Sequence, residues 1–147
     1  MLSAHTDRPV AAAAPPGRRP GLPGYAELHC RSNFSFLAGA SHPGELVQRA
    51  WQLGYTALAL TDECSLAGVV RAHLEIEGER ARLRSGGEAA ASPHPLPRLI
   101  VGAQMRLSSG ARLVVLAQSR RGYGNLSHWI TVARRRAPIA GGDSGSR

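Results

Sequence analysis

The chain has 147 residues, enough for about one domain, and its hydrophobic fraction of 43% is ordinary for a globular protein. Its net charge of +8 comes from 18 arginines, with no lysine, against 10 acidic residues, and a charge of this sign favours encounters with polyanions. An arginine-rich, lysine-free composition can also result from GC-rich coding DNA. Two cysteines exclude a disulfide framework and no apolar run reaches the roughly 18–20 residues of a membrane span, so we expect a reduced, cytoplasmic chain with no membrane partner.

The chain opens on a segment without periodicity and then begins to alternate strands with helices. Residues 1–24 are rich in Ala, Pro, Gly and Arg and are predicted to be a disordered leader. Residues 25–30 have the length of a short strand. The next helix is predicted to start with Ser41 as its N-cap and Pro43 in its first turn, and to end at Gly54.

A buried strand and a longer helix follow. Residues 57–61 form an apolar run of strand length, and residues 66–84 have the spacing of an amphipathic helix. Its predicted apolar stripe includes Val69, Val70, Leu74 and Ile76. Residues 85–97 contain Gly, Ala and Pro and are predicted to be a flexible loop.

The last part of the chain predicts a hairpin and a third helix. Residues 99–107 read as a strand in which Gly102 marks a close backbone approach, and residues 112–117 are the returning strand. Residues 122–136 are predicted to be helical, and residues 138–147 to be a disordered tail. This order of elements predicts an α/β fold with parallel strands.

Polar residues gather where the predicted strands end. Glu27 and His29 are two apart, so on a regular strand they point to the same face. Asp62 and Glu63 add carboxylates at the end of the next strand, and Gln104 lies on the third. Carboxylate and imidazole ligands suit Zn, Mn or Mg. The alternative is that these charges serve helix ends, with Asp62 capping the second helix.

Arginines also gather at both ends of the third helix. Arg134, Arg135 and Arg136 form a basic run at its end, and Arg120 and Arg121 precede it. We favour complementation of the helix dipole together with solvation of the charges. The alternative is contact with a DNA backbone.

Three blocks of the sequence resemble one known domain. The PHP domain of bacterial DNA polymerase III α-type (C-family) enzymes opens on a stretch similar to residues 25–73 here, YAELHCRSNFSFLAGASHPGELVQRAWQLGYTALALTDECSLAGVVRAH. Within it, the error-prone branch of the family is indicated by ELHCRSNFSFL and TDECSLAGVVRAH. Two later blocks also resemble the family, LIVGAQMRL at 99–107 and LVVLAQSRRGYGNLSHWITVARRRA at 113–137.

The resemblance implies a partial, truncated PHP-type distorted (β/α) barrel over residues 25–137, with metal ligands at the carboxyl ends of its strands. Metal-binding members of the family carry His-X-His, Thr-Asp-His and Gly-X-Glu motifs. In this chain the first motif holds Glu27 and His29, the second holds Asp62 and Glu63, and the third ends in Gln104. Three of the five positions therefore depart from the family pattern.

These departures predict a degenerate site. Gln104 is neutral and binds hard cations more weakly than a carboxylate does, and replacing imidazoles by carboxylates disfavours Zn. We expect no catalytic residue in this chain and no cofactor beyond a weak Mg or Mn ion. The ending PIAGGDSGSR does not continue the family pattern and suggests a truncated or frameshifted reading frame.

The function implied by the resemblance is that of the N-terminal PHP region of an error-prone DNA-directed DNA polymerase acting in DNA damage bypass. Its partners would be DNA and replication or damage-bypass proteins, reached through the parent polymerase. The chain lacks the palm that carries nucleotidyl transfer, so its own role would be structural. The alternatives are a stand-alone PHP-type metal-dependent phosphoesterase and a non-catalytic nucleic-acid-binding module.

Overall fold

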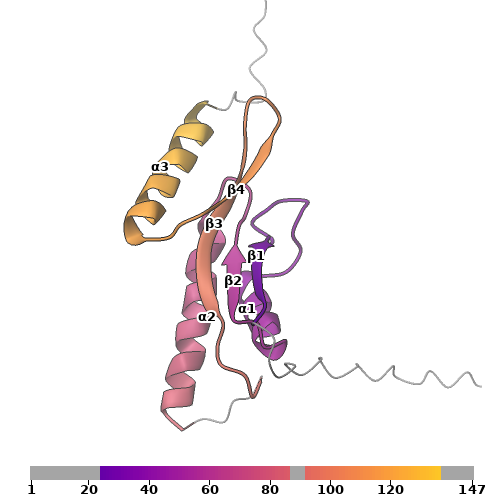
Figure 1. The fold of residues 1–147 in the computed structure, drawn as a ribbon, viewed down its shortest axis with the longest axis vertical. Helices are drawn as coiled ribbons and strands as arrows, with labels where there is room; N and C mark the ends of the chain where they lie inside the picture. The colour runs from indigo at the N-terminus through magenta and orange to yellow at the C-terminus, as the bar shows by residue number, and fades with distance from the viewer. Residues whose placement is uncertain (1–23, 87–91, 137–147) are drawn as a thin grey trace, which may run out of the picture.

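The computed structural model describes residues 24–86 and 92–136 (Figure 1). The predicted leader, apart from Gly24, and the predicted tail lie outside the described residues, as do residues 87–91 of the predicted loop. The elements follow the predicted order: β1 Ala26–Cys30, α1 Pro43–Gln52, β2 Ala57–Leu60, α2 Ala67–Arg84, β3 Arg98–Arg106, β4 Arg112–Leu116 and α3 Arg120–Arg136.

The four strands form one sheet in the order β1-β2-β3-β4. The strands β1, β2 and β3 are parallel, and β4 returns antiparallel to β3, with Gly102 opposite Leu116 and Arg106 opposite Arg112. A Cβ added at Gly102 would lie 2.7 Å from the backbone oxygen of Val115, which confirms the predicted close approach. The predicted α/β fold with parallel strands is therefore confirmed.

All three helices pack on the same face of the sheet. Residues of β3 alternate, so that Leu99 and Val101 pack under α1 and α2 while Ala103 and Met105 pack under α3. The first core cluster joins both early helices to β2 and consists of Val47, Ala50, Leu58, Leu60, Val69, Ala72 and Ile76. The opposite face carries Gly102 and Gln104 of β3 together with Thr61, which directly follows β2, and none of these belongs to either cluster.

The helix α1 starts one residue later than predicted and ends as predicted. Its N-cap is His42 rather than Ser41, because the backbone N–H of His42 donates to Oε2 of Glu45 at 2.8 Å, one half of a capping box. At the other end, Gly54 has a φ of +69°, and its N–H donates to the backbone oxygen of Trp51 at 2.9 Å. Gly54 therefore ends the helix as the left-handed residue of a Schellman motif.

The buried face of α2 differs from the predicted stripe. Val69 and Ile76 are buried as expected, but Val70 and Leu74 are 58% and 64% exposed. The buried positions instead are Gly68, Val69, Ala72 and Ile76. The small residues Gly68 and Ala72 let α2 approach the sheet closely, so the buried face is turned toward them and away from Val70 and Leu74.

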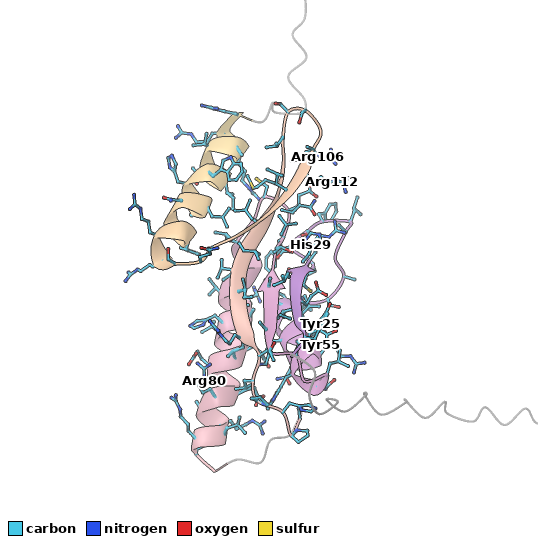
Figure 2. All side chains as sticks on the ribbon, viewed as in Figure 1. Tyr25, His29, Tyr55, Arg80, Arg106 and Arg112 are labelled. Carbon is cyan, nitrogen blue, oxygen red and sulfur yellow. The ribbon has the colours of Figure 1, made fainter. Side chains whose placement is uncertain are left out.

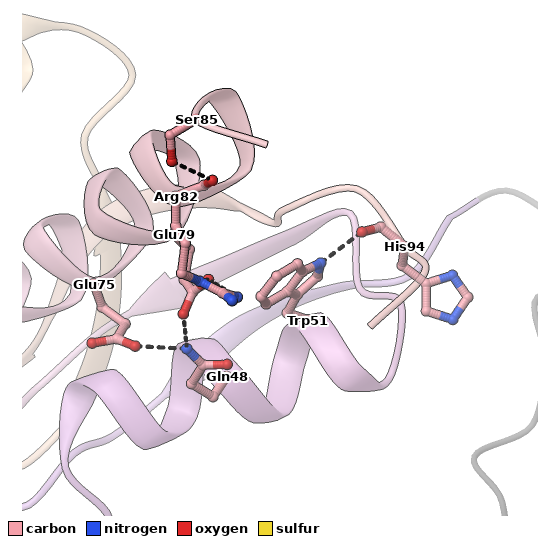
Figure 3. Close-up of polar contacts among 7 residues, drawn as sticks. All are labelled: Gln48, Trp51, Glu75, Glu79, Arg82, Ser85 and His94. Atoms are coloured by element: carbon pink, nitrogen blue, oxygen red, sulfur yellow. Dashed lines mark hydrogen bonds and ion pairs between the residues drawn. The ribbon is translucent and has the colours of Figure 1, made fainter. Parts of the chain in front are cut away.

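Polar contacts also join α1 to its surroundings (Figure 3). The side-chain nitrogen of Gln48 donates to Oε1 of Glu75 at 2.6 Å and to Oε1 of Glu79 at 3.2 Å on α2. The buried indole of Trp51 donates to the backbone oxygen of His94 at 2.6 Å. The second half of the predicted loop thus packs against α1.

The helix α3 begins two residues before its predicted start. Ser119 accounts for this, because its Oγ accepts the N–H of Gly122 at 3.1 Å and its backbone oxygen accepts the N–H of Tyr123 at 2.9 Å. Leu126 and Ile130 bury this helix against Ala103 and Met105. Among the described residues, no helix is both long and apolar enough to cross a membrane.

Candidate functional site

The end of β1 is irregular, which changes how its polar residues lie. The register with β2 shifts between Glu27 and Cys30, where β1 advances three residues against two on β2. This is a β-bulge, so the regular alternation expected for Glu27 and His29 does not hold. His29 reaches the next strand, with its Nδ1 3.2 Å from Oγ1 of Thr61.

The carboxylate of Glu27 accepts hydrogen bonds from residues two positions away on either side. Its Oε1 accepts the backbone N–H of His29 at 2.9 Å, and its Oε2 accepts the hydroxyl of Tyr25 at 2.9 Å. The hydrogen bond from the backbone of His29, and to a smaller extent the one from Tyr25, lower the pKa of Glu27 below its ordinary value. The hydrogen bond between Tyr25 and Glu27, together with the charge of that carboxylate, raises the pKa of Tyr25. Both oxygens of Glu27 therefore have partners already.

Asp62 is the most deeply buried of the predicted site residues, at 1% exposure. Its Oδ1 accepts the backbone N–H of Ser32 and the hydroxyl of Ser35, and its Oδ2 accepts the hydroxyl of Ser32, all at 2.7 Å. Asp62 therefore does not cap α2, whose N-cap is Leu66 with no side-chain cap. The carboxylate instead fastens the loop after β1 to the end of β2.

Glu63 and Gln104 meet at the carboxyl end of the sheet. They are partners in an isolated parallel bridge, in which the N–H of Gln104 donates to the backbone oxygen of Asp62 at 3.0 Å. The N–H of Cys64 donates in turn to the backbone oxygen of Gln104 at 2.8 Å. Gln104 is 4% exposed, on the face of the sheet opposite the two core clusters.

The structure thus brings four of the five predicted residues to one edge of the sheet. His29 reaches Thr61, which precedes Asp62, while Glu63 and Gln104 lie side by side. Glu27 contacts this group through the backbone of His29. In residues 24–86 and 92–136, no three His, Cys, Asp or Glu side chains are placed to hold one metal ion. As arranged, this donor set does not fit a tightly held metal.

The residues that complete this edge were absent from the sequence prediction. Ser32 and Ser35 supply three hydrogen bonds to Asp62, and Ser35 Oγ also accepts the N–H of Glu63 at 3.0 Å. A signal was present, since a carboxylate directly after a buried strand needs donors and the hydroxyl-rich loop after β1 can supply them. Burial, with the charges of Glu27 and Asp62, raises the pKa of Cys30 at the same edge.

Comparison with known proteins identifies a family and several relatives of the chain. The family model of the PHP domain matches residues 27–141. The error-prone DNA polymerase of Azoarcus sp. is 56% identical over 124 residues, which cover 78% of this chain and 12% of that protein. The error-prone DNA polymerase of Dechloromonas aromatica is 59% identical over 120 residues, covering 82% of this chain and 10% of that protein.

The matched part lies in the N-terminal region of these polymerases. The chain therefore spans about a tenth of the length of the curated relatives it matches. Among solved structures, a protein described as a metal-dependent phosphoesterase from Bifidobacterium adolescentis is 20% identical with a TM-score of 0.47, over 76% of this chain and 34% of that one.

Proposed function

Because the chain belongs to the PHP domain family, we propose that it is the N-terminal PHP module of an error-prone DNA-directed DNA polymerase acting in DNA damage bypass. The observation that carries this proposal is the identity of 56–59% to two error-prone DNA polymerases over about four fifths of the chain. The module contributes structure rather than nucleotidyl transfer. Its working partners are DNA and the replication or damage-bypass proteins that the whole polymerase meets.

We further propose that the family's metal site is degenerate here. Glu27, His29, Asp62, Glu63 and Gln104 take the ligand positions, but the oxygens of Glu27 and Asp62 are committed to protein donors. Gln104 offers a neutral amide where a carboxylate would attract a hard cation. The site holds at most a weak Mg or Mn ion and carries no phosphoester hydrolysis.

A domain exchange tests the module assignment. The matched 124-residue stretch of the Azoarcus polymerase is replaced by the corresponding residues of this chain, and primer extension on damaged and undamaged templates is measured. We expect extension within a few fold of the parent enzyme. A chimera that folds but neither extends primers nor bypasses lesions contradicts the assignment. A manganese-dependent phosphatase activity of the 147-residue chain favours a stand-alone phosphoesterase instead.

Metal titration tests the degenerate site separately. We expect no saturable Mn²⁺ binding by the chain in calorimetry at millimolar metal. The matched variant Glu27→His/Glu63→His/Gln104→Glu restores the family's ligand types and should bind Mn²⁺ measurably more tightly. Stoichiometric, micromolar binding by the unchanged chain contradicts the proposal.

A further inference from the structure

The β3–β4 hairpin places two arginines directly opposite each other. Arg106 and Arg112 are Cα partners at the end of the ladder, and both are exposed (Figure 2). Like charges directly opposite on a sheet destabilise the pair. The ion pairs of the described residues both lie on α2, at Glu77–Arg80 and Glu79–Arg82, so none offsets the charge of the hairpin.

A third arginine is brought to the hairpin by α3. The Nε of Arg134 donates to the backbone oxygen of Cys64 at 2.8 Å, which holds the guanidinium at the end of the sheet. Arg134 and Arg106 line one cavity of about 350 Å³, together with Glu63, Cys64, Met105 and Ala133. The interpretation favoured from the sequence is complementation of the helix dipole. It does not account for the hydrogen bond that Arg134 makes to Cys64, 70 residues earlier in the chain.

The hairpin arginine cluster, defined as Arg106, Arg112 and Arg134, carries an uncompensated positive charge. Glu63 is the carboxylate that lines the same cavity, so the two guanidinium groups of Arg106 and Arg134 face one acid there, and Arg112 lies opposite Arg106 on β4. Asp62 adds little, because it is buried and both of its oxygens accept hydrogen bonds from serines. Arg135 and Arg136 extend the exposed charge along the last turn of α3.

We propose that the hairpin arginine cluster binds the phosphate backbone of a nucleic acid strand. Guanidinium groups match phosphate oxygens in a bidentate geometry, and opposed arginines can hold successive phosphates of one strand. The bound polyanion would offset the repulsion between Arg106 and Arg112 that the free protein carries. This deepens the proposed function, on which it rests for the choice of DNA over another polyanion.

The test uses the 147-residue chain and a fluorescein-labelled oligothymidylate, with binding followed by anisotropy across a salt series. The variant Arg106→Gln/Arg112→Gln removes two charges but keeps the side-chain stems. We expect its affinity at low salt to fall roughly tenfold and the slope of log K against log salt to shrink by about 1.4, as for two lost phosphate contacts. Arg106→Lys/Arg112→Lys should keep most of the slope.

The matched control is Arg80→Gln/Arg84→Gln, which makes the same change in net charge on α2, toward the opposite end of the molecule (Figure 2). It should leave the slope unchanged. Circular dichroism melts of all variants check that the fold is retained, which is expected because Arg106 and Arg112 are exposed.

Three outcomes overturn the proposal. The first is a control variant that loses as much affinity as the hairpin variant, because binding then follows net charge alone. The second is an unchanged slope in the hairpin variant. The third is displacement of the DNA by polyglutamate of equal charge as effectively as by unlabelled oligothymidylate, which assigns the cluster to acidic polypeptides. None of these measurements uses the polymerase chimera, so a failure of this proposal can be told apart from a failure of the proposed function.

Discussion

At the scale of single residues, Asp62 shows how a buried charge is tolerated. Two serines of the loop after β1 give its carboxylate three hydrogen bonds, all of 2.7 Å. Burying an unpaired carboxylate is costly, and charge-assisted hydrogen bonds offset that cost. Asp62 therefore fastens the loop after β1 to the end of β2.

We predict that Asp62→Ala destabilises the chain by roughly 2–4 kcal/mol, because it leaves the donors of Ser32 and Ser35 buried and unpaired. Urea denaturation measures the change. Glu77→Ala is the control, since this half-exposed carboxylate pairs on the helix surface and should cost less than about 1 kcal/mol. Equal losses in both variants contradict the fastening role.

The pair of Tyr25 and Glu27 should give a pH-dependent contribution to stability. The lowered pKa of Glu27 means that the folded chain binds this proton less tightly than the unfolded chain does. Its stabilisation is therefore present above the unfolded carboxyl pKa and is lost as pH falls through the lowered folded value. Tyr25→Phe removes one donor, so it should lower the denaturation midpoint at neutral pH but not at pH values below both pKa values.

The measurement is a set of melts of Tyr25→Phe and the unchanged chain from neutral to acidic pH. The two curves of midpoint against pH should converge on acidification. Tyr55→Phe serves as control, because Tyr55 lies edge-on to Tyr25 at a centroid distance of 4.6 Å without a hydrogen bond to Glu27. A constant offset for Tyr25→Phe at every pH contradicts the assignment.

The sequence predicted which residues end the strands but not how their side chains bond. Parallel strands must bring their carboxyl ends to one edge, so the meeting of Glu63 with Gln104 follows from the order of elements. The bulge in β1 inserts one residue and redirects Glu27 and His29, and no turn residue marks it in the sequence. Because these residues still gather at one edge, the metal ligand set remains a proposal for direct titration.

At the scale of elements, the two glycines of α2 lie in different surroundings. A Cβ added at Gly68 would lie 2.8 Å from Oδ2 of Asp62 and 2.9 Å from Cδ2 of Leu60. A methyl group at this position would therefore push α2 away from the sheet. At Gly78, ten residues further along the same helix, a Cβ would meet no atom within 4 Å.

We therefore predict opposite effects for one substitution at two sites of α2. Gly68→Ala should destabilise the chain by roughly 1–3 kcal/mol through overpacking. Gly78→Ala should stabilise it by up to about 1 kcal/mol, because alanine favours the helix and nothing obstructs its methyl group. Chemical denaturation of both variants measures the difference, and a stabilising Gly68→Ala contradicts the close packing.

Seven elements were predictable from periodicity, and their ends were less so. Helix α1 ends at Gly54, which has a left-handed backbone conformation that favours glycine, so this end could be predicted from the residue type. Its start moved from Ser41 to His42 because Glu45 accepts the N–H of His42, a choice between neighbouring residues that depends on loop geometry. The exposed side of α2, with Val70 and Leu74, shows that glycine and alanine can define a buried face as well as larger residues do.

At the scale of the whole molecule, the core has two unequal parts. The first cluster joins α1, α2 and β2 through seven buried residues, whereas the second consists of Ala103, Met105, Leu126 and Ile130. Leu66 packs against both. The helix α3 buries two side chains, against four buried positions on each of α1 and α2. Because fewer apolar side chains hold α3, we expect it to be less stable than the part built around α1 and α2.

We predict that α3 opens locally before the rest of the described fold. Native-state hydrogen exchange should show backbone amides of α3 exchanging through a lower free energy than those of α1, because less apolar surface is lost when α3 detaches. Leu126→Ala should widen this gap by roughly 2–4 kcal/mol in α3 while leaving α1 protection unchanged. The control Val47→Ala removes a side chain from the larger cluster, so it should lower protection in α1, α2 and α3 together. Uniform protection of all three helices in the unchanged chain contradicts this division, because both clusters would then unfold as one unit.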